Sequence, residues 1–153
     1  MKPYSLYVKK ENGRVIDTQD EWGIVCKELP FLLYGASKEL PKRDWHDEDG
    51  EDTFFPSQLA MAAYDLDVEF GYKGAMDSAN VAVRSFLDYL TGRDGSGTYL
   101  SVYDTYTKIG RQGVYFKSVG QDVFVRNTSE GDLVVFNVKF RVTDPMTEIT
   151  LAV

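Results

Sequence analysis

The feature that most constrains the fold is a run of alternating apolar and polar residues near the end of the chain. Apolar side chains occupy every second position of this run: Val134, Phe136, Val138, Phe140 and Val142. Polar side chains stand between them at Asn137, Lys139 and Arg141. Successive side chains of a strand point to opposite faces of its sheet, so the pattern indicates a half-buried strand. It predicts a sheet with one face against a core and the other in water.

One helical segment separates this strand from an earlier one. The segment DSANVAVRSFLDYLTG begins with an Asp-Ser cap and ends at Gly92. Its apolar residues recur at helical spacing: Ala79, Ala82, Val83, Phe86, Leu87 and Leu90. We expect a helix over about residues 78–91 that packs on the sheet through Phe86, Leu87 and Leu90.

Further strand-like segments lie on both sides of this helix: DLDVEFGY before it, and YLSVYDTY, GVYFKSV, DVFVR and LVVFNVKFRVTD after it. A parallel sheet would need a helix between each pair of strands. The order therefore predicts an α+β, mainly β fold, an antiparallel β-sandwich or split barrel with one flanking helix. The length of 153 residues is that of one domain, and we expect residues 1–153 to form it.

The beginning of the chain gives weaker patterns. Residues 4–9 predict a short strand, the Asn12-Gly13 pair predicts a hairpin turn, and residues 14–16 predict the partner strand. The apolar patches at residues 23–26 and 31–34 are too short for helices. We expect irregular strands at both.

Residues 41–56 are the longest segment without a periodic pattern. Six acidic residues gather in it: Asp44, Asp47, Glu48, Asp49, Glu51 and Asp52. Its large apolar side chains are Trp45, Phe54 and Phe55. A segment this polar, bounded by prolines, is typical of a surface loop. Residues 59–64, which follow it, fit either a short helix or the beginning of an extended strand.

The chain carries 17 Lys and Arg against 24 Asp and Glu, a formal charge of −7. Nucleic-acid binding draws on clustered cations, so we expect no specific nucleic-acid partner. Cys26 is the only cysteine, and no basic N-terminal region leads into an apolar run. We therefore expect synthesis in a reducing cytoplasm without an export signal. No apolar run approaches the ~20 residues that cross a bilayer, so we expect no membrane partner.

The residues that could carry chemistry do not stand in the patterns that chemistry needs. Placing Gly50 at the sixth position of an EF-hand loop puts Trp45 and Pro56 where an aspartate and a glutamate are required. His46 is the only histidine, and with Cys26 it supplies too few ligands for a catalytic zinc site. We expect no enzyme activity, no catalytic residue, no metal and no cofactor. We also expect His46→Ala and Cys26→Ala to leave the fold and any assembly intact.

Two functions of other classes stay open. A glycan- or peptide-binding module could use a strip of aromatic rings, for which the candidates are Tyr99, Tyr103 and Tyr106. A small enzyme could use carboxylates of one strand, for which the candidates are Asp65, Asp67 and Glu69. Such an enzyme would need one raised pKa within a cleft.

The segment NGRVIDTQDEWGIVCKELPFLLYGASKELPKRDWHDEDGEDTFF resembles the opening of phage distal-tail proteins. In that family an early hairpin leads to an aromatic-Gly-Ile/Val step, a strand and an Arg-Asp-Gly-like loop. Trp22-Gly23-Ile24 and Asp49-Gly50 stand at those places. The segment DLDVEFGYKGAMDSANVAVRSFLDYLTGRDG is similar to the strand, the helix and the Leu-rich helix end of the same family. The resemblance covers about residues 13–145, and its motifs are structural ones without a catalytic signature.

This resemblance implies a structural component of a phage or prophage tail that acts by self-assembly and is located in the virion tail. It implies a ring of identical copies, a hexamer in the family, with other tail or baseplate proteins as further partners. Distal-tail, tube and tail-terminator roles share the implied fold and the formation of rings, so the sequence does not separate them. An acidic surface suits a conduit for DNA, because like charges disfavour contacts with phosphates.

The acidic loop is the candidate contact with a neighbouring copy. An isolated surface loop has little reason to carry apolar rings, so we expect these interface residues: Trp45, Asp47, Asp49, Phe54 and Phe55. The rings could equally pack onto their own domain. Shortening the loop would dissolve the oligomer and spare the monomer in the first case, and would lower the stability of the monomer in the second.

Overall fold

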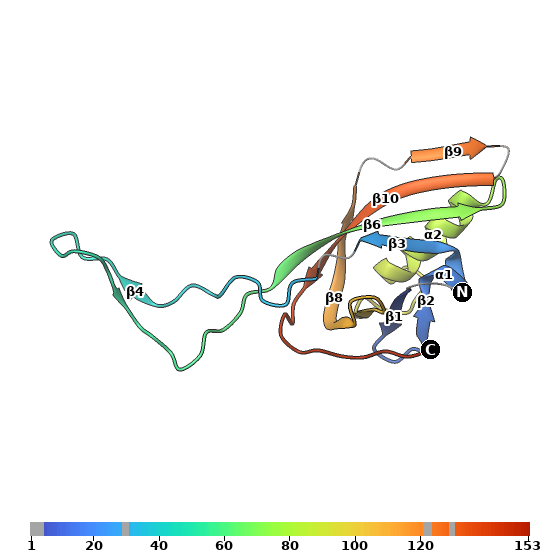
Figure 1. The fold of residues 1–153 in the computed structure, drawn as a ribbon. Coiled ribbons are helices and arrows are strands. Elements are labelled where there is room, and N and C mark those ends of the chain that lie inside the picture. Colours follow the sequence, from blue (N-terminus) through green and yellow to red (C-terminus); the bar gives the residue numbers. More distant parts are fainter. Residues whose placement is uncertain (1–4, 29–30, 121–123, 129–130) are drawn as a thin grey trace.

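The computed structural model describes residues 5–28, 31–120, 124–128 and 131–153. Most of this part of the chain is β-sheet, against which two helices pack (Figure 1). The strands are β1 (Leu6–Lys10), β2 (Val15–Asp17), β3 (Ile24–Glu28), β4 (Lys42–Arg43), β5 (Asp52–Thr53), β6 (Tyr64–Gly74), β7 (Leu100–Asp104), β8 (Ile109–Val119), β9 (Phe124–Thr128) and β10 (Gly131–Val142). The helices are α1 (Thr18–Trp22) and α2 (Ala79–Thr91). No helix among the described residues is long and apolar enough to cross a membrane.

One large antiparallel sheet has the strand order β2-β1-β7-β8-β10-β6-β3. The long strands β6 and β10 pair from Asp132 opposite Gly74 to Val142 opposite Tyr64. On its other side β10 pairs first with β9 and then with β8. The sheet curls into a half-barrel, and α2 lies on its concave side (Figure 1). The predicted mainly β, antiparallel fold with a flanking helix is therefore confirmed.

The alternation in β10 has the consequence expected of it. Its buried apolar residues are Val134, Phe136, Val138, Phe140 and Val142, each at most 3% exposed. Asn137 and Lys139 lie between them on the outer face and are exposed. The outer face of the neighbouring strand β6 carries Asp65 and Asp67, which are exposed as well. The half-barrel thus has an apolar inner face and a charged outer face.

Helix α2 fills the concave side through a cluster of aromatic rings. The ring centroid of Phe86, which is 0% exposed, lies 5.1 Å from that of Phe70 and 6.3 Å from that of Phe136. Leu90 is also buried, whereas Leu87 is only half-buried. The predicted Asp-Ser cap is not the one that forms. Ser78 makes no side-chain cap, and the Ala79 N–H instead donates to Oδ2 of Asp132, at 3.0 Å.

The prediction of a single helix was wrong, because α1 is a second one. Asp17 caps its beginning by accepting a hydrogen bond from the Gln19 N–H at 2.9 Å. Gly23 ends it in the left-handed conformation, with φ of 69°, and donates to the Gln19 carbonyl. Trp22 of α1 packs its ring against two rings of α2, with centroid distances of 5.2 Å to Phe86 and 5.1 Å to Tyr89.

Of the weaker patterns near the beginning of the chain and after the acidic loop, some predicted the structure and one did not. The hairpin at the beginning forms as predicted, with β1 and β2 on either side of the turn. Residues 23–26 fall largely within β3, but residues 31–34 form no strand, so that prediction was wrong. Residues 59–64 are extended, because Met61 bridges to Ser37 and β6 begins at Tyr64.

Candidate functional site: an exposed arm

Residues 31–63 leave the half-barrel as a long arm made of two chain segments that run side by side (Figure 1). Few hydrogen bonds join the segments, among them Lys38 N–H to the Ala60 carbonyl at 2.8 Å and Ala62 N–H to the Ala36 carbonyl at 2.9 Å. Farther out, β4 pairs with β5. No residue from 31 to 63 is buried. The arm therefore has no core of its own, and the predicted acidic loop is its outer end.

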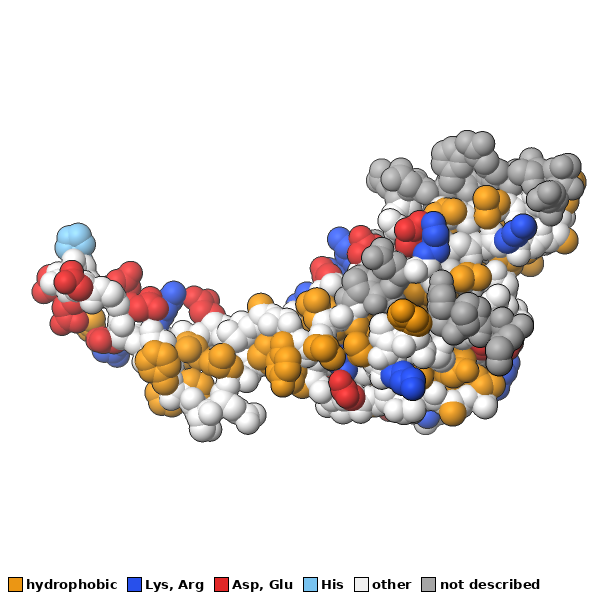
Figure 2. Space-filling model, in the orientation of Figure 1, with side chains coloured by type: hydrophobic (Ala, Val, Ile, Leu, Met, Phe, Trp, Pro, Cys, Tyr) orange, Lys and Arg blue, Asp and Glu red, His pale blue; other side chains and the backbone are white. Residues whose placement is uncertain are grey.

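The arm carries a disproportionate share of the exposed apolar surface. Sixteen large apolar side chains are exposed among the described residues, and seven of them belong to the arm: Leu32, Leu33, Tyr34, Trp45, Phe54, Phe55 and Leu59. The arm has only 33 of the 153 residues. Phe54 is 64% exposed and Phe55 is 80% exposed, and neither packs against the core. Figure 2 shows such side chains along the lower side of the arm. A concentration of this kind is typical of an interaction surface.

The tip of the arm, residues 44–51, is acidic (Figure 2). Asp47 and Asp49 are exposed there, and Arg43 lies over the ring of Trp45 at 5.9 Å. Among the described residues, no three His, Cys, Asp or Glu side chains are placed to hold a metal ion. His46 is exposed at the tip, whereas Cys26 lies in β3 on the half-barrel, so the structure does not bring them together.

The carboxylates proposed for an enzyme lie on the wet outer face of β6. Asp65 accepts hydrogen bonds from Arg141 at 3.0 Å and from Lys117 at 3.1 Å. These two bonds hold the pKa of Asp65 below its ordinary value. Glu69 pairs with Lys27 at 3.3 Å. An acid catalyst needs a raised pKa, so the environment of Asp65 is the opposite of the one that this hypothesis requires.

The three tyrosines proposed as a binding strip do not form one. Tyr103 is 9% exposed, and its ring stacks on that of Tyr7 at a centroid distance of 6.3 Å. Tyr99 and Tyr106 are exposed at 40% and 75%, and both lie outside the strand that carries Tyr103. The middle ring of the strip is therefore buried, and a sugar or peptide could not stack on all three.

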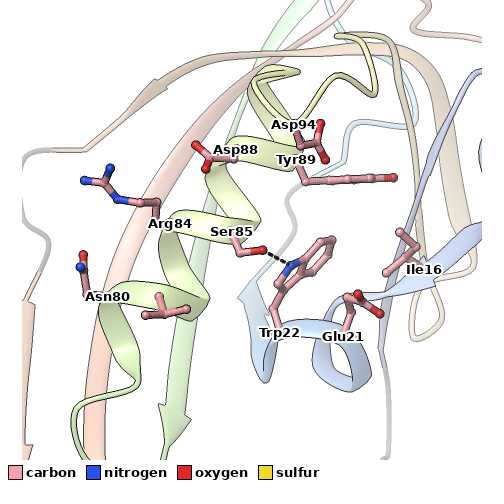
Figure 3. Close-up of a pocket in the computed structure, with 10 residues that line it drawn as sticks. Ile16, Glu21, Trp22, Asn80, Arg84, Ser85, Asp88, Tyr89 and Asp94 are labelled. Atoms are coloured by element: carbon pink, nitrogen blue, oxygen red, sulfur yellow. Dashed lines mark hydrogen bonds between the residues drawn. The ribbon is translucent and has the colours of Figure 1, made fainter.

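The hollow between α1 and α2 has a volume of about 520 Å³ and is shown in Figure 3. The indole Nε1–H of Trp22 donates to Oγ of Ser85 at 3.2 Å, so this hydroxyl acts as an acceptor. Burial raises the pKa of Tyr89 to about 12, and the charge of Asp94 adds to the effect. The phenol of Tyr89 is thus neutral at physiological pH.

Two stretches of strand edge are open within the part of the chain that the structure describes. On one side, β3 covers β6 only from Glu69 to Tyr72, which leaves Tyr64–Val68 without a strand partner there. On the other side, β7 covers β8 only as far as Val114, which leaves residues 115–119 without one. The two open edges lie on opposite sides of the β6–β10 pair.

Comparison with known proteins informs the fold. Neither a family profile nor a curated protein matches the chain. Among solved structures, it is similar to the Dit protein of phage SPP1, described as a paradigm of the hub adsorption apparatus in phages that infect Gram-positive bacteria. The TM-score is 0.54 at 15% sequence identity, and the match covers 94% of this chain and 51% of that one. The chain thus spans about half the length of Dit. The likeness shows a fold related to that of a phage tail protein.

Proposed function

We propose that the protein is a structural component of a phage or prophage tail, a distal-tail or tube-like ring protein that acts by self-assembly. The fold shared with SPP1 Dit supports the general role. The observation that carries the proposal is the arm, which extends apolar side chains into solvent without a core beneath them. Exposed apolar surface of this kind marks sites of protein–protein contact.

The apolar rings of the arm provide the driving force for that contact. Burying one phenylalanine that is otherwise exposed contributes about 1.5–3 kcal/mol. Phe54 and Phe55 together would contribute about 3–6 kcal/mol for each arm, before the cost of ordering is subtracted. In a ring each copy reaches one neighbour with its arm and receives the arm of the other, so every copy makes the same two contacts. We place Trp45, Asp47 and Asp49 at the outer end of this interface.

The open strand edges support the same head-to-tail arrangement. An unpaired edge has free N–H and C=O groups that can pair with a strand of another chain. The edge of β6 at Tyr64–Val68 and the edge of β8 at residues 115–119 lie on opposite sides of the sheet. If the β6 edge of one copy pairs with the β8 edge of its neighbour, the sheet continues from copy to copy. A ring of six, located in the virion tail beside other tail or baseplate proteins, is the form we propose.

The test is the mass of the protein in solution across a range of concentrations, measured by sedimentation. The decisive variant is Phe54→Asp combined with Phe55→Asp, which makes the arm polar at its most exposed rings. The matched control is Ser57→Asp, because Ser57 is an exposed residue of the same arm and the change adds charge without removing a ring. We expect the native chain and the control to assemble, and the double variant to remain a monomer with an unchanged thermal unfolding temperature.

Two results would contradict the proposal. A native chain that stays monomeric at millimolar concentration has no tendency to form a ring, since mass action favours assembly there. A double variant whose monomer unfolds at a lower temperature would instead show that Phe54 and Phe55 stabilise their own domain.

A further inference from the structure

The root of the arm, residues 31–34, contacts the half-barrel through the side chain of Phe31, which packs against the core, and through one buried arginine. Arg111 lies in β8 opposite Val102 of β7, on the core side, and is 1% exposed. Its guanidinium donates from Nη1 to the Gly110 carbonyl at 3.0 Å and from Nη2 to the Leu32 carbonyl at 3.1 Å. The first acceptor is its own neighbour in the chain. The second is a backbone group of the arm.

This arginine is costly to bury. Arg111 takes part in none of the ion pairs between described side chains, and its Nε–H has no hydrogen-bond partner among them. Burying a cation without a carboxylate is unfavourable, and an apolar side chain at such a position is often neutral or stabilising. A charged residue facing Val102 therefore does little for the core. What it does is hold the Leu32 carbonyl.

The peptide groups of Leu32 are held from two directions. The Leu32 N–H donates to Oη of Tyr64 at 3.4 Å, while its carbonyl accepts from Arg111. Tyr64 is the first residue of β6, where the returning segment of the arm enters the sheet. The outgoing and returning segments are thus tied together at one point. Beyond it Leu33 is already 60% exposed and Tyr34 is 74% exposed.

Phe31, at the beginning of the root, packs against the core, but the later residues of the root have no apolar contact of this kind. Between the root and the C-terminal segment lies an open hollow of about 750 Å³, lined by Tyr34, Leu59 and Met146 among others. The exposed fractions of Leu59 and Met146 are 52% and 41%. Side chains that line an open hollow do not fix the angle of the arm. Beyond Phe31, the hydrogen bonds at Leu32 are the contacts that can fix the direction of the arm.

We propose that Arg111 is a positioning residue that fixes the direction in which the arm leaves the half-barrel, acting through the Leu32 carbonyl. A fixed arm loses less conformational freedom when it docks on a neighbour, which favours assembly. This consequence rests on the proposed function. The anchoring itself does not, because it concerns one copy of the chain.

The anchoring is tested by the distance between two spin labels in one chain, measured by pulsed electron resonance. In a Cys26→Ala background, the labels are attached at Asp49→Cys on the tip and at Lys73→Cys on the exposed face of β6. An excess of unlabelled protein ensures that only distances within one copy are observed. Arg111→Met removes both hydrogen bonds of the guanidinium. The matched control is Arg141→Met, which removes a guanidinium that binds Asp65 and not the arm.

We expect one narrow distance peak both in the background protein and in the control Arg141→Met. We expect Arg111→Met to lose that peak in favour of a broad distribution while the domain still unfolds cooperatively. Tyr64→Phe, which removes the second tie to Leu32, should broaden the peak less. A merely structural role for Arg111 would change the unfolding temperature and leave the peak narrow.

A narrow, unshifted peak in folded Arg111→Met would overturn the inference, as would a broad distribution in the background protein. If Arg111→Met does not fold, Arg111→Lys and Tyr64→Phe take its place, and unchanged peaks in both would overturn it equally. Sedimentation of the same proteins separates the two proposals. If the peak in Arg111→Met is broad and no protein assembles, only the proposed function is contradicted. If assembly depends on Phe54 and Phe55 but the distance peaks are unchanged, only the anchoring is contradicted.

Discussion

Phe86→Ala should be among the most destabilising single changes in the chain. The side chain is fully buried, and its ring packs against Trp22 at 5.2 Å, Phe70 at 5.1 Å and Phe136 at 6.3 Å between centroids. Truncating a buried phenylalanine to alanine costs about 3–5 kcal/mol. Each aromatic pair adds about 0.5–1.5 kcal/mol beyond the buried area, so we expect a loss near the upper end. Most domains have only about 5–15 kcal/mol in total.

The neighbouring residue provides the control. Leu87 is one position away on the same helix but is half-buried. Full burial would make Leu87→Ala cost about 2–5 kcal/mol. Half of the transfer free energy of a leucine is about 1 kcal/mol, and that is the cost we expect. Urea unfolding followed by circular dichroism measures both free energies. If Leu87→Ala proves as costly as Phe86→Ala, the packing of α2 on the sheet has been misassigned.

Three further predictions concern pH and backbone conformation. Because burial raises the pKa of Tyr89 to about 12, the folded chain keeps this phenol protonated while the unfolded chain ionises it from about pH 10. Stability should therefore fall by at most about 3 kcal/mol as the pH rises from about 10 to 12, and urea unfolding of Tyr89→Phe should lack this fall. The hydrogen bond from Arg141 is the largest cause of the lowered pKa of Asp65. The stabilisation that ionised Asp65 provides is present above the ordinary carboxyl pKa of ~3.9 and is lost as the pH falls through the lowered pKa. Asp65→Asn should therefore unfold at a lower temperature than the native chain at neutral pH, and at the same temperature in strong acid. Gly92→Ala should cost more than Gly95→Ala in urea unfolding: both positions have positive φ, which costs an alanine about 1–2 kcal/mol, but only at Gly92 would the new Cβ meet a backbone oxygen, at 2.7 Å.

The elements with a long local period were predictable from the sequence. In β10 the apolar and polar residues alternate over the whole strand, and α2 has apolar residues at helical spacing over three turns. Helix α1 has only five residues, too few for a periodic pattern. Its available signals were the capping residues Asp17 and Gly23. Missing α1 also left the burial of Tyr89 unpredicted, because Trp22 of α1 covers the Tyr89 ring, which is 6% exposed.

The sequence predicted that residues 41–56 lie on the surface, but not that residues 31–63 form an arm. Its composition indicated exposure for residues 41–56. The arm continues from this segment to the half-barrel because Lys38 bonds to Ala60 and Ala62 bonds to Ala36. These are backbone hydrogen bonds between residues that show no strand pattern, so the sequence does not indicate them. The cap of α2 was unpredictable for a similar reason. The carboxylate of Asp132 accepts the hydrogen bond from the Ala79 N–H, and the two residues are 53 positions apart in the chain.

The buried position of Arg111 follows from a local irregularity in β8. Simple alternation from Val114, which faces the core, would put Gln112 inward and Arg111 outward in water. Gly113 instead has φ of 67°, and the pairing of β7 with β8 shifts register at this place. A bulge adds one residue to a strand and reverses the faces of the residues beyond it. Arg111 therefore points inward, where it reaches the arm. A glycine in a strand pattern is the sequence signal for such a bulge, and at Gly113 it decides which side chain can hold the root of the arm.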